Sequence, residues 1–148
     1  MEIMIVIMIL GIISMLAVPN LLQANERWML RSTAHMISND IRRMQSMSIH
    51  ESDQYQFELH TKSFYYQTKN YQANADIIKR VTLDPRITTI TSTLYDPKYA
   101  GQRAGYRILC FSYLGSPNQA GTITLKTNKG NSIVITIIVN TGRVYVND

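Results

Sequence analysis

The N-terminal apolar run is the feature that most restricts how this chain can fold. Between Ile3 and Leu22 there is no Asp, Glu, Lys or Arg. As a helix this stretch is about 30 Å long, enough to cross the hydrocarbon core of a bilayer. The acidic Glu2 stands at its start. Because a carboxylate inside a membrane costs on the order of a few kcal/mol, we expect Glu2 to have a specific partner.

A secretory signal peptide and a plain membrane anchor are the two simple explanations of this run. A secretory signal peptide carries Lys or Arg ahead of its apolar core and small residues at a cleavage site. Here the only charge before the run is the negative Glu2, and the helical pattern continues beyond Asn20. A plain membrane anchor accounts for the length of the run and leaves Glu2 unexplained.

The run continues into an amphipathic stretch in which apolar residues recur at three- and four-residue steps. We predict one helix from Glu2 to about His50, kinked or loosened near Gly11 and Pro19. A sheet must cover its second half. The side predicted to face that sheet holds Leu22, Glu26, Met29, Leu30, Thr33, Ala34, Met36, Ile37, Ile41 and Met44. The opposite side holds Arg27, Arg31, Ser38, Asn39, Arg42, Arg43 and Gln45.

The rest of the chain alternates β-branched or aromatic stretches with turn residues, which predicts antiparallel hairpins. The predicted strands are Tyr55–Leu59, Ser63–Gln67, Ile77–Leu83, Ile87–Tyr95, Tyr106–Tyr113, Thr122–Thr127, Ser132–Val139 and Arg143–Val146. Hairpins that pack one face on a long helix give an α+β fold. We therefore expect a transmembrane or filament-core helix at 1–22, its amphipathic continuation at 23–52 and a β-rich head at 53–148.

The segment Glu2–Asn20 closely resembles the N-terminal segment of type IV pilins and type II secretion pseudopilins. That family has the Glu, the Gly-containing apolar helix and the closing Pro at the same spacings. A looser resemblance, to GspH/FimT-type minor pseudopilins and Gram-positive competence pseudopilins, rests on Phe111, Gly115, Gly121-Thr122-Ile123 and Gly142-Arg143-Val144. The resemblance implies a structural filament subunit of a secretion pseudopilus, type IV pilus or competence pilus, with Glu2, Gly11 and Pro19 as assembly residues.

The resemblance also implies partners and a location. The partners are other pilin subunits, met through the N-terminal helix, the inner-membrane assembly platform, and the prepilin peptidase acting on the full-length precursor. The chain is expected to be a single-pass inner-membrane protein with its head outside the cytoplasm, and later part of a filament. Glu2 is expected to pair with the N-terminal amine of a neighbouring subunit. We also expect upstream codons for a short basic leader with a Gly, and for an aromatic residue three positions before Met1.

The sequence offers little for chemistry. The single cysteine, Cys110, excludes an intramolecular disulfide, and its apolar neighbours predict a buried strand thiol. His35, His50 and His60 lack metal-ligand spacing, and there is no Gly-rich phosphate loop, nucleophile elbow or paired-carboxylate site. We therefore expect no enzymatic activity, no metal and no cofactor.

The net charge of +5 leaves a second function open. Some FimT-type proteins are associated with a Gly-Arg-x-Arg ending that contacts DNA. In this chain the corresponding residues are Gly142-Arg143-Val144-Tyr145, so Tyr replaces the second Arg. The alternative hypothesis is therefore a DNA-binding minor pilin that acts in DNA uptake, with Lys126, Lys129 and Arg143 as candidate nucleic-acid contacts.

Overall fold

A computed structural model describes the chain except for residues 1, 72–75, 95–104, 140 and 148 and the side chains of residues 2 and 16–20. The described residues form one helix and eight strands. They are α1 (Glu2–His50), β1 (Tyr55–His60), β2 (Tyr65–Asn70), β3 (Ile77–Thr82), β4 (Ile87–Ser92), β5 (Tyr106–Phe111), β6 (Gly121–Thr127), β7 (Ser132–Ile137) and β8 (Val144–Asn147). The predicted α+β fold is confirmed.

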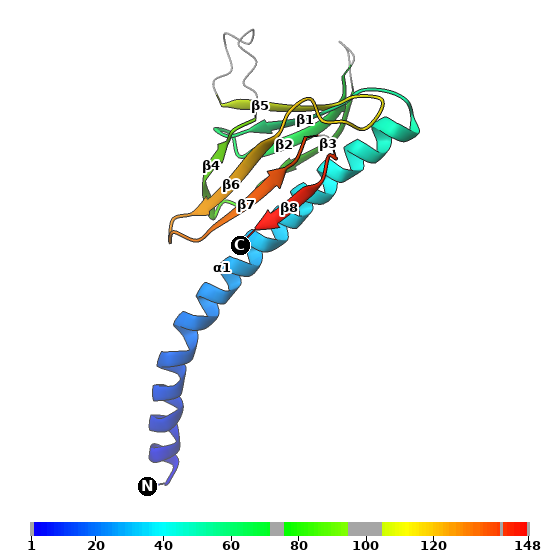
Figure 1. Cartoon of the computed structure of the whole chain (residues 1–148). Coiled ribbons are helices and arrows are strands. Elements are labelled where there is room, and N and C mark those ends of the chain that lie inside the picture. Colours follow the sequence, from blue (N-terminus) through cyan, green and yellow to red (C-terminus); the bar gives the residue numbers. More distant parts are fainter. Residues whose placement is uncertain (1, 72–75, 95–104, 140, 148) are drawn as a thin grey trace.

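The helix α1 is continuous through Gly11 and Pro19. Figure 1 shows it as a long, gradually curving helix whose second half lies along the strands and whose first half projects beyond the head. The kink or loosening predicted near Gly11 and Pro19 does not interrupt the helix. Within the described residues, α1 has no stretch long and apolar enough to qualify as a membrane span.

The strands form two four-stranded sheets rather than one. Sheet A has the order β3-β2-β1-β5 and sheet B the order β4-β6-β7-β8, and all the described pairings are antiparallel. The chain passes from sheet A to sheet B between β3 and β4, returns for β5, and then completes sheet B. Four predicted strands are too long at their C-terminal ends, and Tyr95 lies outside the described residues. The observed ends are Thr82 in β3, Ser92 in β4, Phe111 in β5 and Ile137 in β7.

The core lies between the second half of α1 and the inner faces of both sheets. The predicted stripe Leu30, Ala34, Ile37, Ile41 and Met44 is buried there as expected. It packs with aromatic and branched side chains of the strands, including Phe57, Leu59, Tyr66, Leu109, Phe111, Ile123, Leu125 and Ile135. Each fully buried large apolar side chain contributes about 1.5–3 kcal/mol, so the head stabilises this half of the helix.

Two positions correct the predicted helix faces. Leu22, placed on the covered side, is 53% exposed because the head does not extend that far along α1. Ser38, placed on the polar side, is buried, and so is the neighbouring Asp40. Because sheets A and B together cover a wider arc of α1 than one sheet would, short polar residues beside the apolar stripe are also enclosed.

Candidate subunit interface

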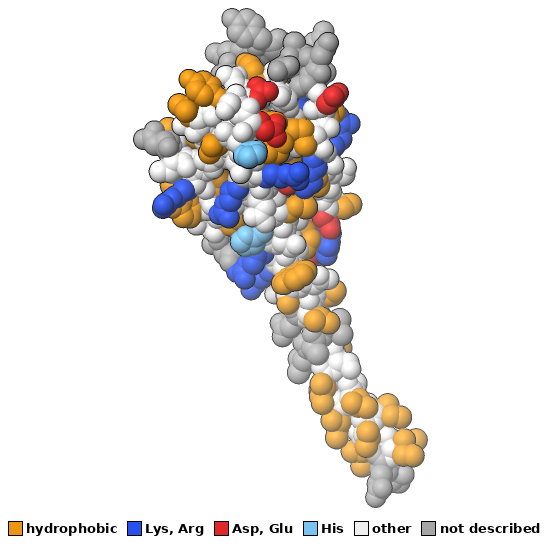
Figure 2. All heavy atoms as spheres, turned by 90° about the vertical axis from the view of Figure 1, so that its right-hand side faces the viewer, with side chains coloured by type: hydrophobic (Ala, Val, Ile, Leu, Met, Phe, Trp, Pro, Cys, Tyr) orange, Lys and Arg blue, Asp and Glu red, His pale blue; other side chains and the backbone are white. Residues whose placement is uncertain are grey.

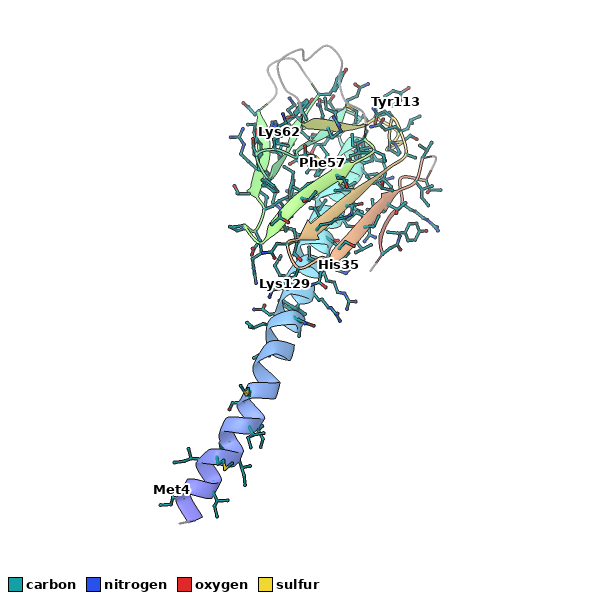
Figure 3. The ribbon with its side chains drawn as sticks, turned by 90° about the vertical axis from the view of Figure 1, so that its left-hand side faces the viewer. Met4, His35, Phe57, Lys62, Tyr113 and Lys129 are labelled. Atoms are coloured by element: carbon teal, nitrogen blue, oxygen red, sulfur yellow. The ribbon has the colours of Figure 1, made fainter. Side chains whose placement is uncertain are left out.

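The first half of α1 presents a continuous apolar surface to solvent. Every residue from Ile3 to Met15 is exposed, and the large side chains range from 51% exposed at Ile9 to 81% at Met15. Figure 2 shows hydrophobic side chains along the visible face of the projecting helix, and Figure 3 places Met4 far from the head. Removing such surface from water is strongly favourable, so this stretch requires a covering partner.

Two small residues shape this surface. A side chain at Gly11 would meet nothing within 4 Å, so within this chain Gly11 lies in open space. The Ser14 hydroxyl donates to the Leu10 carbonyl at 2.8 Å, which satisfies the only side-chain hydroxyl between Ile3 and Met15 inside the helix itself. The two other predicted assembly residues, Glu2 and Pro19, lie on the α1 backbone, and their side chains are outside the described part of the structure.

At the base of the head an ion pair joins the helix to sheet B. The Lys129 Nζ lies 2.8 Å from the Glu26 carboxylate, and the Asn131 amide is 3.5 Å from the same group. Lys129 and Asn131 belong to the turn between β6 and β7. Lys129, one of the candidate nucleic-acid contacts, therefore already pairs with a carboxylate of its own chain.

The structure does not bring the three candidate nucleic-acid contacts together. Lys126 pairs with Ser132 at the end of sheet B where the β6–β7 turn lies. Arg143 directly precedes Val144, which pairs with Ile137 at the opposite end of β7. The length of β7 separates these ends by about 17 Å, so the three side chains do not form one patch.

A buried carboxylate joins the middle of α1 to sheet A. Asp40 is 7% exposed, accepts a hydrogen bond from the Tyr66 hydroxyl at 2.5 Å, and lies 2.6 and 2.8 Å from the Lys79 Nζ. Burial and the neighbouring Asp40 raise the pKa of Tyr66 far above its usual range, so the phenol stays a donor. Sequence reasoning missed this contact, although Asp40 follows Ile37 by three residues and precedes Met44 by four, which places it on the apolar stripe.

Two loops of the head close on the end of α1. The Gln45 amide donates to the carbonyls of Gly115 at 3.0 Å and Thr141 at 3.3 Å. Gly115 and Gly142 have φ of 76° and 63°, and a side chain at either would collide with Ile49 or Gln45 of the helix. Both glycines belong to the looser resemblance noted above, and in this fold they allow the loops to approach α1.

The residues considered for chemistry are dispersed. His35 and His50 are exposed on α1, whereas His60 is half-buried at the end of β1. Cys110 is only half-buried on β5, not fully buried as predicted, because its side chain lies on the face of sheet A away from the helix. Burial, reinforced by the charge of Glu58, raises the pKa of the Cys110 thiol to about 11. Among the described residues no cluster of His, Cys, Asp or Glu is arranged to hold a metal.

No protein-family model matches the sequence, and no curated protein matches it. Solved structures do match. The chain is similar to the minor pseudopilin EpsH from the type 2 secretion system of Vibrio cholerae, with a TM-score of 0.62 and 11% identity over 80% of this chain and 95% of that one. It is also similar to the type IV minor pilin FimU of Pseudomonas aeruginosa, with a TM-score of 0.61 and 14% identity over 83% of this chain and 91% of that one.

The chain has the fold of a type IV pilin or pseudopilin. The pilin fold expected from the segment Glu2–Asn20 is thus confirmed. The match includes the head, because it extends over most of the chain. In this pilin fold, the second half of α1 is part of the head and the exposed apolar half is what remains to be covered. The comparisons give no support to the DNA-uptake alternative.

Proposed function

We propose that this chain is a structural subunit, of the minor pilin or minor pseudopilin type, of a type IV filament system. The observation that carries the proposal is the contrast within α1. Its residues from Ile3 to Met15 are exposed and almost all apolar, whereas the stripe Leu30, Ala34, Ile37, Ile41 and Met44 is buried in the head. In the filament, the apolar halves of neighbouring helices cover one another and the heads form the surface.

Before assembly, the proposed subunit is held in the inner membrane by 1–22, with its head outside the cytoplasm. Glu2 then pairs with the N-terminal amine of a neighbouring subunit. Each of these charges is costly in lipid when alone, and docking removes that cost, so the correct register is favoured as subunits join. The inner-membrane assembly platform and the prepilin peptidase, acting on the precursor, are the further proposed partners. This is a structural and not an enzymatic role.

A charge placed in the exposed apolar stretch tests the proposal. In Ile9→Lys the new ammonium must be buried between helices or in lipid, so we expect the subunit to be lost from sheared filaments. Thr89→Lys is the matched control because Thr89 is exposed on the head. Immunoblots of filament, membrane and soluble fractions give the measurement. Absence of the wild-type chain from filaments, or equal incorporation of both variants, would refute the proposed role.

A further inference from the structure

A pocket of about 370 Å³ lies over the face of sheet A that is turned away from α1. Strands β1, β2, β3 and β5 supply His60, Tyr65, Arg80 and Tyr106, and the β1–β2 turn adds Lys62. Figure 3 places Lys62 in the upper part of the head, far from Lys129 at its base. Among the residues that the structure describes, the lining contains Lys62 and Arg80 and no Asp or Glu.

Beside this pocket lies a carboxylate that is already neutralised. Glu58 is 0% exposed, forms an ion pair with Lys69, and accepts hydrogen bonds from the amides of Gln67 and, at 3.0 Å, Gln56. Burial raises the pKa of Glu58, but the donors Lys69, Tyr106 and Gln67 outweigh it and hold the pKa below its usual value. Because Lys69 compensates its charge, Glu58 leaves the positive charge of Lys62 and Arg80 available to a ligand.

The guanidinium of Arg80 is held in place by its neighbours. Its Nε and Nη2 donate to the Gln67 side-chain oxygen at 3.1 and 2.8 Å, and its Cζ lies 5.1 Å from the centre of the Tyr65 ring. Tyr65 in turn stacks on His60 at 4.1 Å, and His60 meets Tyr106 edge-on at 4.8 Å. A guanidinium has five N–H donors, so donors remain for a ligand. Because its position is already fixed, little conformational entropy is lost on binding.

The position of Arg80 indicates which class of ligand fits. Arg80 belongs to β3, one of the two edge strands of sheet A, which among the described residues pairs only with β2. Ile77 and Ile78 of this edge are 47% and 40% exposed. An extended peptide adds to such an edge through main-chain hydrogen bonds, which a nucleic acid cannot provide. A side chain opposite Arg80 on the outer face would then lie within reach of the pocket.

We propose that this pocket binds a carboxylate side chain of an acidic peptide segment that a partner protein lays along β3. The Arg80 guanidinium matches the planar carboxylate, and Lys62 adds a second charge at the mouth. The proposal does not depend on membership of a filament.

The test uses the full chain in detergent micelles and a labelled hexapeptide of alternating Thr and Glu. We expect it to bind, and the Thr–Gln hexapeptide to bind at least about tenfold more weakly because it lacks the charge-assisted hydrogen bonds. Lys62→Gln combined with Arg80→Gln should weaken binding of the acidic peptide by about tenfold. Lys126→Gln combined with Arg143→Gln, the matched loss of two exposed charges elsewhere on the head, should leave it nearly unchanged.

The proposal is overturned by no binding of the acidic peptide, by equal weakening in both double variants, or by equal affinity for the two peptides. Tighter binding of inorganic phosphate or of a short single-stranded oligonucleotide would assign the pocket to phosphate instead. Thermal unfolding of each double variant checks the fold, which should be retained because Lys62 and Arg80 are exposed.

Discussion

Two buried carboxylates, Asp40 and Glu58, stabilise different parts of the head. Asp40 joins α1 to β2 and β3 through Tyr66 and Lys79. Glu58 organises the outer face of sheet A through Lys69 and the two glutamines beside it. Buried charges of this kind are tolerated only when paired and hydrogen-bonded, and both of these are.

Glu58 makes the stability of the head depend on acid. Its folded pKa is held below the ordinary value of 4.5, so its ionised form stabilises the head at neutral pH, and this contribution is lost as pH falls through the folded pKa. We expect Glu58→Gln to lower the free energy of unfolding at pH 7, and the difference from wild type to shrink at pH 3. Urea unfolding at the two pH values measures it. A difference of the same size at both pH values would contradict the stabilising role of the ionised Glu58.

Glu2 carries the second residue-scale prediction. Glu2→Ala should leave the chain in the membrane and reduce its amount in filaments. Removing the charge lowers the cost of the lipid-embedded monomer, while the assembled state loses the counter-charge of the neighbouring amine. Immunoblots of sheared-filament and membrane fractions, with leader cleavage checked separately, provide the measurement. Equal incorporation of wild type and variant would show that Glu2 only reaches the headgroup level.

At the scale of elements, the two halves of α1 have different surroundings: the first half projects from the head, and the second half packs against the strands. Glu26 contacts the head through Lys129 and Asn131, and Met29 is the first buried apolar residue among those of α1 whose side chains are described. Farther along, Gln45 binds the two glycine loops. The half of α1 that belongs to the head therefore begins near Glu26.

This division predicts that the chain without residues 1–25 is a soluble, folded head. The cut removes the exposed apolar stretch and retains Glu26 and every buried contact described for α1. A cooperative thermal transition of the shortened chain, followed by circular dichroism, is the expected result. A soluble product without such a transition would show that the head depends on the removed half of the helix.

Much of this architecture follows from periodicity. The three- and four-residue spacing of Leu30 to Met44 predicts the buried face of α1, and β-branched runs bounded by Gly, Pro and Asn predict most strands. The division into sheets A and B could not be predicted, because it depends on pairings between strands distant in sequence, such as β1 with β5. For the same reason the surroundings of Asp40 and Glu58 were missed: Tyr66 and Lys79 reach Asp40 from β2 and β3, and Gln67 and Lys69 reach Glu58 from β2.

For the candidate interface, the sequence predicts the exposed apolar stretch itself but not the arrangement of basic residues. Lys126, Lys129 and Arg143 are close in sequence, yet β7 separates Arg143 from the other two. The pocket over sheet A draws residues from four strands and a turn. No local pattern in the sequence reports such a site.

At the scale of the whole molecule, the head lies at one end and a bare apolar helix projects from it (Figure 1). A single copy in water leaves the surface from Ile3 to Met15 uncovered. Lipid covers it one copy at a time, whereas a filament covers it with the same stretch of other copies or of related subunits. The account therefore requires that this surface meet other pilin-type helices.

Photocrosslinking in sheared filaments tests that requirement most directly. A photoreactive residue replaces Ile7, 64% exposed on the apolar stretch, or, as a control, Tyr113, 56% exposed on the head. The account predicts that the probe at Ile7 forms adducts with the N-terminal helices of neighbouring subunits, and that the probe at Tyr113 forms none with those helices. Recovery of the protein only from the membrane fraction, with no helix adduct at Ile7, would contradict the claim that this chain is a filament subunit.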